Sequence, residues 1–452
     1  MNEFDRFLVS CVPSERQILH SETEFYAFFH FGVNTFTDRE WGDGTESPLI
    51  FDPEELDAEQ WIDAVSAAGM KGAILTAKHH DGFCLWPSGF TEHSVKNSPF
   101  RNGNGDVVRE VSEACRKKGL KFGVYLSPWD RHEPTYGQGK AYDDYFCGQL
   151  TELLTQYGEL FSVWFDGACG EGPNGKKQVY DWERYYALVR KLQKNACISI
   201  CGPDIRWCGN EAGQTRESEW SVLPSPADNI DFKSRDLGSR EFLRGAKKLR
   251  WYPSETDTSI RPGWFYHAEE DDRVKSADTL IDLWYRTVGG NSSLLLNVPP
   301  DKRGLICEAD VKSLKKLGDH IRKTFSVNLA ESAAFTADKT DALHGANALK
   351  TDTYDVYYKA PDFETTATVT ALLPEKTTVS RVVIKEHVPL SQRVEKFAVD
   401  VRLADGSWKN AAEGTTVGYK RILRIDPVET DAVRIRILDS RVCPVLSFIG
   451  IY

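Results

Sequence analysis

The sequence of 452 residues lacks the run of roughly 18 apolar residues that a membrane-spanning helix requires. Its first residues, MNEFDRFLVSCVPSERQ, contain an early acidic residue and no apolar stretch, so they do not resemble a signal peptide. Basic runs are also absent, and the net charge is −11, which argues against a surface that binds phosphates. We therefore expect neither a membrane nor a nucleic-acid partner.

Paired metal-binding cysteines are missing as well. The ten cysteines include no CxxC motif, and the nearest spacings, among Cys197, Cys201 and Cys208, have no histidines nearby at zinc spacing. A glycine fingerprint for a dinucleotide and a phosphate loop are absent too. The sequence thus predicts no metal and no cofactor. Scattered cysteines are typical of free thiols in a reducing compartment, which favours the cytoplasm over an exported form whose leader has been removed.

What the sequence does contain is an alternation of apolar runs and amphipathic stretches from residue 20 to about 325. The apolar runs are FYAFFHF (25–31), GAILTA (72–77), KFGVYL (121–126), FSVWFD (161–166), CISI (197–200), RWYPS (250–254) and SLLLNV (293–298). Such runs are typical of strands buried on both faces of a parallel sheet. The stretches 57–68, 107–118, 141–156, 181–193, 274–288 and 309–325 have helical periodicity. This pattern predicts an α/β fold, a (β/α) TIM-like barrel, over residues 1–330.

The pattern of apolar and polar residues changes after residue 330. From about 335 the chain has short alternating runs such as TATVTALL, EKFAVDVRL and AVRIRIL, separated by turn signals such as ADGSW. Alternation with a period of two predicts an all-β sandwich over residues 331–452. We expect this second domain to brace the barrel.

Polar residues follow the apolar runs of the predicted barrel. These are His30, then Lys78, His79, His80 and Asp81, then Tyr125, Ser127, Trp129 and Asp130, then Asp166, Glu255 and Asn297. In a β/α-barrel the active site lies at the carboxyl ends of the strands. The sequence therefore predicts that these side chains converge on one site.

Each of these residues also has an ordinary explanation. His30 could be a core histidine, and Asp166 could cap the turn that follows its strand. Adjacent residues on a strand point to opposite faces, so His79 and His80 are not expected to share a metal ion. Asp166 is the strongest candidate, because a carboxylate that ends a buried aromatic run is costly to desolvate unless it is used or paired.

At these positions the sequence resembles the α-L-fucosidases of glycoside hydrolase family 29. The matching stretches are FFHFGVNTFTDREWGDG (28–44), ILTAKHHDGFCLWPS (74–88), KFGVYLSPWDRH (121–132), SVWFDGA (162–168), WCGNEAG (207–213), IRPGWFYH (260–267) and LLLNVPPDKRG (295–304). They follow one another through the whole predicted barrel. The stretch 379–401 resembles the galactose-binding-like sandwich that often follows such barrels.

The resemblance implies a role for individual residues. Asp166 matches the nucleophile and Glu211 the general acid/base of a retaining double displacement. Positions that contact the fucose ring in the family are matched by His30, Glu40, Trp41, His79, His80, Tyr125 and Trp264, with Arg261 as a weaker suggestion. The resemblance thus implies an exo-acting enzyme whose partner is a fucosylated oligosaccharide or glycoconjugate.

The motifs HFGVNTFTDREWGDG and CGNEAG resemble those of the subgroup that acts on α1,3/1,4-linked fucose of Lewis-type glycans. Glu255 is the alternative for the acid/base, and Glu217 and Glu219 are further candidates. Two other functions stay open at this stage. One is a different retaining glycosidase, such as an α-galactosidase, and the other is a non-catalytic glycan-binding protein on the same barrel.

Overall fold

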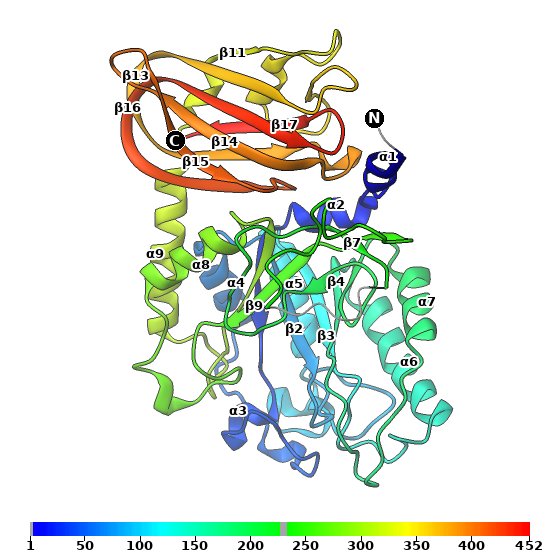
Figure 1. The fold of residues 1–452 in the computed structure, drawn as a ribbon. Helices are drawn as coiled ribbons and strands as arrows, with labels where there is room; N and C mark the ends of the chain where they lie inside the picture. The colour runs from blue at the N-terminus through cyan, green and yellow to red at the C-terminus, as the bar shows by residue number, and fades with distance from the viewer. Residues whose placement is uncertain (1–2, 227–232) are drawn as a thin grey trace.

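A computed structural model describes residues 3–226 and 233–452 and contains a barrel and a second, antiparallel sheet (Figure 1). The barrel strands are β1 Phe25–Phe29, β2 Gly72–Lys78, β3 Lys121–Leu126, β4 Ser162–Phe165, β5 Cys197–Ile200, β6 Arg206–Trp207, β9 Ser254–Ser259 and β10 Ser292–Asn297. Their order is β5-β4-β3-β2-β1-β10-β9-β6, and every pair in this sheet is parallel. A parallel bridge between Ser199 and Ile205 nearly closes the circle. The predicted TIM-like barrel is confirmed.

Helices surround the barrel as the amphipathic pattern predicted. They are α4 Ala58–Ala67, α5 Val107–Lys118, α6 Lys140–Gln156, α7 Trp182–Leu192, α8 Ala277–Thr287 and α9 Glu308–Thr324. Aspartates begin three of them, because the carboxylates of Asp57, Asp106 and Asp181 each accept a hydrogen bond from a backbone N–H of the first turn. Three short helices, α1 Glu3–Val9, α2 Glu15–Ser21 and α3 Val33–Thr37, lie near the N-terminus of the chain.

One predicted strand was wrong. The run 250–254 was expected in the barrel, but β8 Leu249–Trp251 pairs with β7 Val222–Pro224 in a separate two-stranded sheet. The barrel strand is β9, whose sequence SETDTS is polar although every residue is buried. Glu255 therefore lies within a strand and not after one. The apolar-run pattern does not predict β9, because Glu255, Thr256 and Asp257 are stabilised by hydrogen bonds to other barrel residues and not by apolar packing.

The C-terminal sheet is antiparallel and curved. Its strands are β11 Ala334–Ala337, β12 Tyr358–Lys359, β13 Ala367–Glu386, β14 Val394–Arg402, β15 Trp408–Gly414, β16 Arg421–Ser440 and β17 Val445–Ile451. The order is β12-β17-β13-β16-β14-β15, with β11 also paired to β13. Its apolar residues form their own core, which agrees with the predicted all-β sandwich. We propose that the domain boundary lies at residue 330, between α9 and β11.

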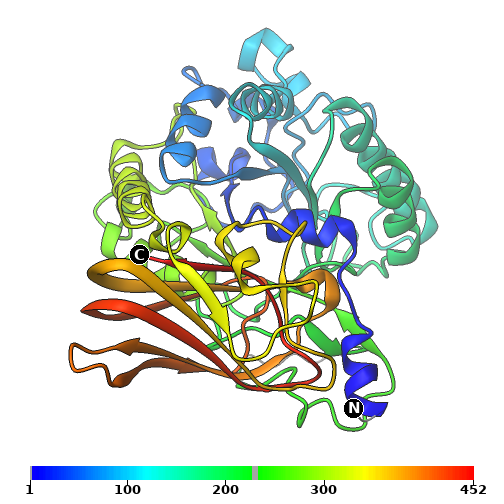
Figure 2. The same cartoon turned by 90° about the horizontal axis from the view of Figure 1, so that it is seen from above.

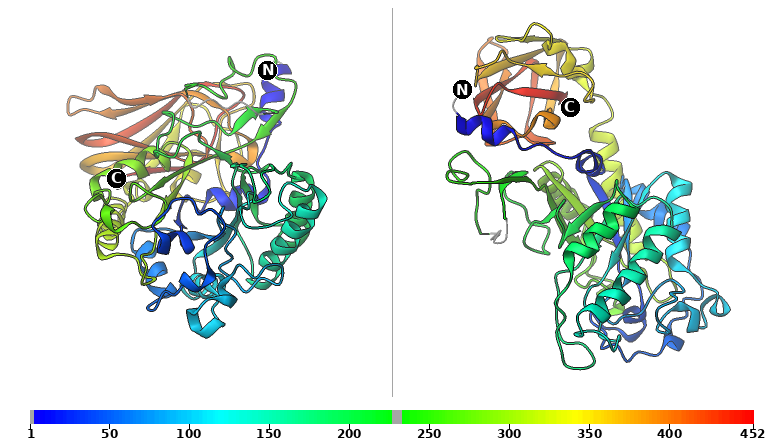
Figure 3. Two further views of the ribbon diagram at one scale, coloured as in Figure 1. Left: turned by 90° about the horizontal axis from the view of Figure 1, so that it is seen from below. Right: turned by 90° about the vertical axis from the view of Figure 1, so that its right-hand side faces the viewer.

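The sandwich lies at the end of the barrel where the strands begin, and α3, which follows the carboxyl end of β1, lies at the other end (Figure 1). The right-hand view of Figure 3 shows α9 running from the barrel to the sandwich, and Figures 2 and 3 show α1, next to the N label, beside the sandwich. Direct contacts join the two bodies: the rings of Phe325 and Tyr452 are 4.8 Å apart, and the Tyr419 N–H donates to Asn291 Oδ1 at 2.7 Å. The opposite end of the barrel is thus left open for a site.

Among the described residues, no helix combines the length and the apolar character that are needed to cross a bilayer.

The packing of α9 on α4 depends on a close approach at Gly318. A Cβ atom built there would lie 1.8 Å from the carbonyl oxygen of Ala67. An alanine normally stabilises a helix interior, by about 0.5–1 kcal/mol relative to glycine. We predict the opposite sign for Gly318→Ala, a loss of about 1–3 kcal/mol, because the helices must separate. Thermal or denaturant unfolding measures this, and Lys316→Ala on the exposed face of α9 is the matched control, with a change within about 0.5 kcal/mol. Stabilisation by Gly318→Ala would contradict the close packing.

Candidate active site

A small cavity of about 150 Å³ lies at the carboxyl ends of the barrel strands. Its lining residues are Phe28, His30, Glu40, Trp41, His79, His80, Tyr125, Trp164, Asp166, Ala168, Glu211, Asp257 and Trp264. All nine residues predicted from the sequence as catalytic or substrate-binding are among them. Residues from six barrel strands (β1, β2, β3, β4, β6 and β9) or from the loops after them therefore converge, as expected for the active end of such a barrel.

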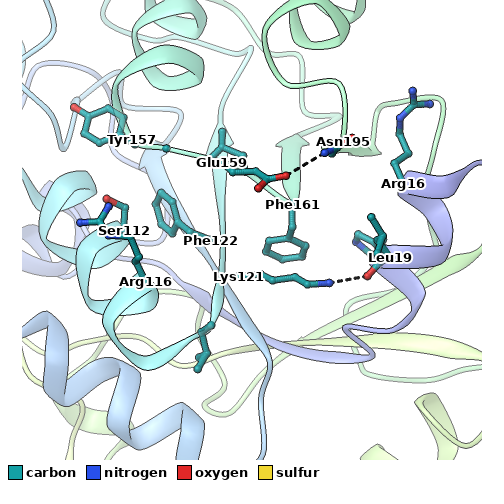
Figure 4. Close-up of a pocket in the computed structure, with 14 residues that line it drawn as sticks. Arg16, Leu19, Ser112, Arg116, Lys121, Phe122, Tyr157, Glu159, Phe161 and Asn195 are labelled. Atoms are coloured by element: carbon teal, nitrogen blue, oxygen red, sulfur yellow. Dashed lines mark hydrogen bonds between the residues drawn. The ribbon is translucent and has the colours of Figure 1, made fainter. Parts of the chain in front are cut away.

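A larger cavity, of about 420 Å³, lies at the opposite end of the barrel, where β3 and β4 begin (Figure 4). Its polar groups are already paired: Lys121 donates to the carbonyl of Leu19 at 2.8 Å, and Glu159 accepts from Asn195 at 3.1 Å. Glu159 is the only carboxylate among its lining residues, all of which the structure describes. Because glycoside hydrolysis uses a pair of carboxyl groups, the smaller cavity is the candidate active site.

Asp166 follows the last residue of β4 directly, as the sequence predicted. Its Oδ1 accepts a hydrogen bond from the Ala168 N–H at 2.7 Å, and its Oδ2 accepts one from the Tyr125 hydroxyl at 3.0 Å. His80 Nε2 lies 4.0 Å from Oδ2. Two donors on rigid backbone and strand positions therefore fix the direction of this carboxylate.

The second carboxylate, Glu211, comes from the loop after β6 and is exposed. Its Oε2 accepts a hydrogen bond from the Trp264 indole N–H at 3.3 Å. Gly213 has a φ of +70°, which a glycine adopts without strain, and a Cβ there would lie 2.6 Å from Leu283. The loop is thus anchored on its far side, while Glu211 faces both the cavity and solvent.

Hydrogen bonds to two of the cavity histidines, His80 and His30, determine which of their ring nitrogens is an acceptor. The Ser127 hydroxyl donates to the carbonyl of Trp129, so His80 Nδ1, at 2.7 Å, must donate to Ser127 Oγ. The amide nitrogen of Asn297 donates to Ser259 and to the Trp264 carbonyl, so its Oδ1 accepts from His30 Nδ1 at 2.9 Å. In the neutral rings, Nε2 of both histidines is therefore a hydrogen-bond acceptor.

Burial keeps these histidines neutral. It lowers the pKa of His30 from 6.5 to about 4, even though the hydrogen bond to Asn297 opposes the shift. It also lowers the pKa of His79 and of His80, and repulsion by His80 and His30 lowers that of His79 further. At neutral pH Nε2 of His30 and of His80 can thus each accept a hydrogen bond from a sugar hydroxyl, because the single N–H of each ring already donates to Asn297 or to Ser127.

His79 and His80 lie differently from the expectation that neighbours on a strand point to opposite faces. Strand β2 ends at Lys78, so both residues lie in the turn that follows it. Their ring centroids are 4.2 Å apart, and both rings line the cavity. The expectation that the two side chains point to opposite faces was wrong, because the period of two holds only inside the strand.

The floor of the cavity is the top of the barrel core. Phe28 and Trp164, with ring centroids 5.3 Å apart, pack in the barrel interior together with Tyr125. Neither Phe28 nor Trp164 was among the predicted site residues, although each alternates along its strand with residues that face the helices. Trp41, with 57% of its surface exposed, and Trp264 add two indole rings at the cavity mouth.

Asp257 is a cavity residue that sequence reasoning missed altogether. It lies in β9, it is 3% exposed, and its Oδ1 accepts a hydrogen bond from the Trp207 indole at 2.8 Å. Burial raises its pKa well above the ordinary value for an aspartate. The only signal in the sequence was the alternation of polar residues in SETDTS, which the apolar-strand criterion excluded.

The alternative acid candidates lie outside the cavity lining. Glu255 is fully buried and accepts hydrogen bonds from the Trp164 indole at 2.7 Å and from the Tyr26 hydroxyl, and burial raises its pKa to about 7. Glu219 is buried in ion pairs with Arg206 and Arg216. Glu217 is exposed near Arg421.

Arg261 does not line the cavity either. Its buried guanidinium pairs with Asp310 and Asp271. The structure therefore gives it a contact with helix α9 and not with the candidate site.

Comparison with known proteins identifies the family. Residues 16–324 match the family model of α-L-fucosidase. The chain is 39% identical to α-L-fucosidase 1 of Arabidopsis thaliana over 98% of this chain and 87% of that protein. It superposes with a TM-score of 0.88 on the crystal structure of SpGH29, at 33% identity over 98% of both chains. It also superposes on the Ruminococcus gnavus GH29 fucosidase E1_10125 in complex with fucose, with a TM-score of 0.86 and 30% identity, over 98% of this chain and 95% of that one. The chain therefore belongs to the α-L-fucosidases of glycoside hydrolase family 29.

Proposed function

We propose that this α-L-fucosidase is an exo-acting, retaining enzyme that releases α1,3/1,4-linked fucose from Lewis-type glycans. The observation that carries the proposal is a single small cavity, at the carboxyl ends of the strands, that contains both Asp166 and Glu211. A cavity of this size, closed below by Phe28 and Trp164, accommodates one terminal sugar ring and leaves the rest of the glycan outside.

In the first step Asp166 attacks C1 of fucose and forms a glycosyl-enzyme ester, while Glu211 protonates the departing glycosidic oxygen. The two hydrogen bonds from Tyr125 and Ala168 hold the attacking carboxylate in line. Glu211 suits the acid role because its loop lies at the cavity mouth, where the leaving sugar must depart.

In the second step Glu211 removes a proton from water, and the water attacks C1 from the face that the leaving group occupied. The bond between C1 and Asp166 breaks, so the product keeps the α-configuration. The same carboxyl group thus acts first as an acid and then as a base.

Recognition of fucose uses both polar and apolar contacts. Nε2 of the neutral His30 and His80 rings and the carboxylate of Glu40 offer acceptors to the ring hydroxyls, and His79 adds a third imidazole ring to the lining. Phe28 and Trp164 supply an apolar wall for the C5 methyl group, with Trp41, Trp264 and Tyr125 around the ring. A sugar that lacks a matching hydroxyl would leave these buried groups unpaired, which opposes its binding.

The linkage preference rests on the motifs 28–44 and 207–213, which surround the cavity mouth. Two exposed indoles, of Trp41 and Trp207, lie in these same motifs. Flat aromatic faces at this position suit the apolar face of the sugars next to fucose in a branched glycan. The partner is accordingly a fucosylated oligosaccharide or glycoconjugate.

We also infer that the protein works in a reducing compartment, as expected for the cytoplasm. All ten cysteines are free, and six of them are buried.

Asp166→Gly tests the nucleophile. We expect a loss of activity of about a thousandfold or more, because no group remains to form the ester. Added azide should restore part of the rate by occupying the vacated space, and NMR should identify the product as β-fucosyl azide. Tyr136→Phe, a buried tyrosine outside the cavity lining, serves as a control and should keep near wild-type turnover. Substantial activity of Asp166→Gly without azide would exclude Asp166 as the nucleophile.

Glu211→Ala tests the acid/base. We expect the loss of kcat/KM to be about 10²–10⁴-fold for natural oligosaccharides and much smaller for aryl fucosides whose leaving groups need no proton. Steady-state kinetics on both substrates measures this difference. Equal losses on both would remove Glu211 from the acid role, and Glu255→Gln would then be the variant to compare.

The linkage preference is tested with a panel of fucosylated trisaccharides. We expect kcat/KM to be highest for α1,3- and α1,4-linked fucose and at least about tenfold lower for α1,2-linked fucose, because the branch sugars contact the mouth of the cavity. Product analysis by chromatography measures the rates, with the corresponding galactosides as the control for sugar identity. A preference for α1,2-linked fucose would contradict the proposed linkage.

A further inference from the structure

The histidine that ends the stretch IRPGWFYH lies between two carboxylates. His267 Nδ1 is 2.7 Å from Asp38 Oδ1, and His267 Nε2 is 2.8 Å from Glu40 Oε1. The histidine side chain is 12% exposed, whereas the Asp38 side chain is 59% exposed. The two carboxylates come from the segment after α3, so this arrangement joins two loops that are more than 220 positions apart in the sequence.

Glu40 links His267 to the cavity through its hydrogen bonds. Its Oε2 accepts from the Trp264 N–H at 2.9 Å, and its Oε1 accepts from the Phe265 N–H at 3.0 Å. The indole N–H of Trp264 in turn donates to Glu211. Glu40, Trp264 and Glu211 all line the cavity, but His267 and Asp38 do not. Contacts therefore run without a break from Asp38 to the proposed acid/base.

We propose that His267 is a positioning residue, whose protonated ring bridges Asp38 and Glu40 and so holds Glu40 and Trp264 in place over the cavity. Deprotonation releases one side of this bridge and weakens substrate binding. The proposal deepens the α-L-fucosidase activity and does not depend on which residue is the acid/base.

The charge balance supports a cationic ring. An imidazolium donates from both nitrogens, whereas a neutral ring donates from one and would present a lone pair to the second carboxylate. The bridge thus needs the proton. Other charged groups nearby have their own partners: Arg39 pairs with Asp43 and Glu46, Arg261 pairs with Asp310 and Asp271, and Glu270 accepts from the Gly263 N–H.

The direction of the pH dependence follows from these contacts. Burial lowers the pKa of His267, but the hydrogen bonds and charges of Glu40 and Asp38 outweigh it, so the pKa is raised above 6.5. A raised pKa means that the bridge is fully formed below the ordinary imidazole pKa and is lost as the pH rises through the folded value. The loss of the bridge therefore lowers kcat/KM on the alkaline side of its pH profile.

Three variants separate the bridge from its surroundings. Asp38→Asn removes one negative charge, and asparagine suits this position because φ of residue 38 is +60°. His267→Gln removes the titrating group. Tyr266→Phe is the matched control, because the Tyr266 hydroxyl contacts only Asp271, at 3.3 Å, among the described residues and lies outside the cavity lining.

The experiment combines two measurements on the full chain. The first is an NMR titration of the imidazole signals, in which the signal that His267→Gln removes identifies His267. The second is kcat/KM against pH for an aryl α-L-fucoside with a good leaving group. Departure of that group needs no proton, so the titration of the general acid does not enter the profile.

We expect His267 to titrate above 6.5 in the wild-type protein and in Tyr266→Phe, and at a lower pH in Asp38→Asn. The alkaline decrease in kcat/KM should move by the same amount in Asp38→Asn and disappear in His267→Gln. We also expect His267→Gln to raise KM roughly tenfold with a smaller change in kcat, since a charge-assisted hydrogen bond to Glu40 is lost.

Titration of His267 at or below 6.5 would overturn the proposal. So would an Asp38→Asn profile that coincides with the wild type, or a loss in His267→Gln that falls on kcat alone. If His267→Gln does not fold, the signal of His267 can be assigned by proximity to Asp38 and Glu40, and Asp38→Asn alone decides the outcome. Absence of activity on the aryl α-L-fucoside in the wild-type protein would instead count against the proposed function.

Discussion

Parallel hydrogen bonding around the barrel forces the carboxyl ends of eight strands to one rim, and the candidate site depends on this constraint. Phe28 pairs in register with Asn297 on one side and with Ile74 on the other, and Tyr125 pairs with Trp164. Residues that follow these positions therefore lie at the same level along the barrel axis, at its carboxyl-terminal rim. Asp166, His30, His79 and His80 come together for this reason, although up to 136 positions separate them along the chain.

The barrel core also sets the electrostatic properties of the site. Its top layer of aromatic rings excludes water from beneath the cavity, and this burial keeps the histidines neutral. Nε2 of the neutral His30 and His80 rings, after β1 and β2, can accept hydrogen bonds, whereas charged rings would only donate. Burial acts on carboxyl groups in the opposite sense, since it raises the pKa of Glu255 below the floor and of Asp257 in the wall.

The loops add what the strands cannot supply. Trp264 reaches across to Glu211, and Glu40 holds the backbone on both sides of Trp264. These contacts form between segments that are distant in the sequence, and they determine the shape of the cavity mouth. The same mouth receives the leaving part of the substrate, so linkage preference and loop geometry depend on the same few contacts.

The sequence by itself indicated the barrel, the helices around it, the family and nine of the thirteen residues that line the cavity, because apolar runs, helical periodicity and local motifs are properties of neighbouring residues. It located Asp166 correctly, since a carboxylate directly after a buried strand is visible in a few letters. Only the tertiary structure decided the rest. It identified the polar run SETDTS as a barrel strand, added Phe28, Trp164 and Asp257 to the cavity lining and showed Glu255 to be buried under Trp164. The physical reason is that a polar strand is stabilised by partners from other strands, such as Tyr26, Trp164 and Trp207, and such pairing leaves no periodic pattern in the sequence.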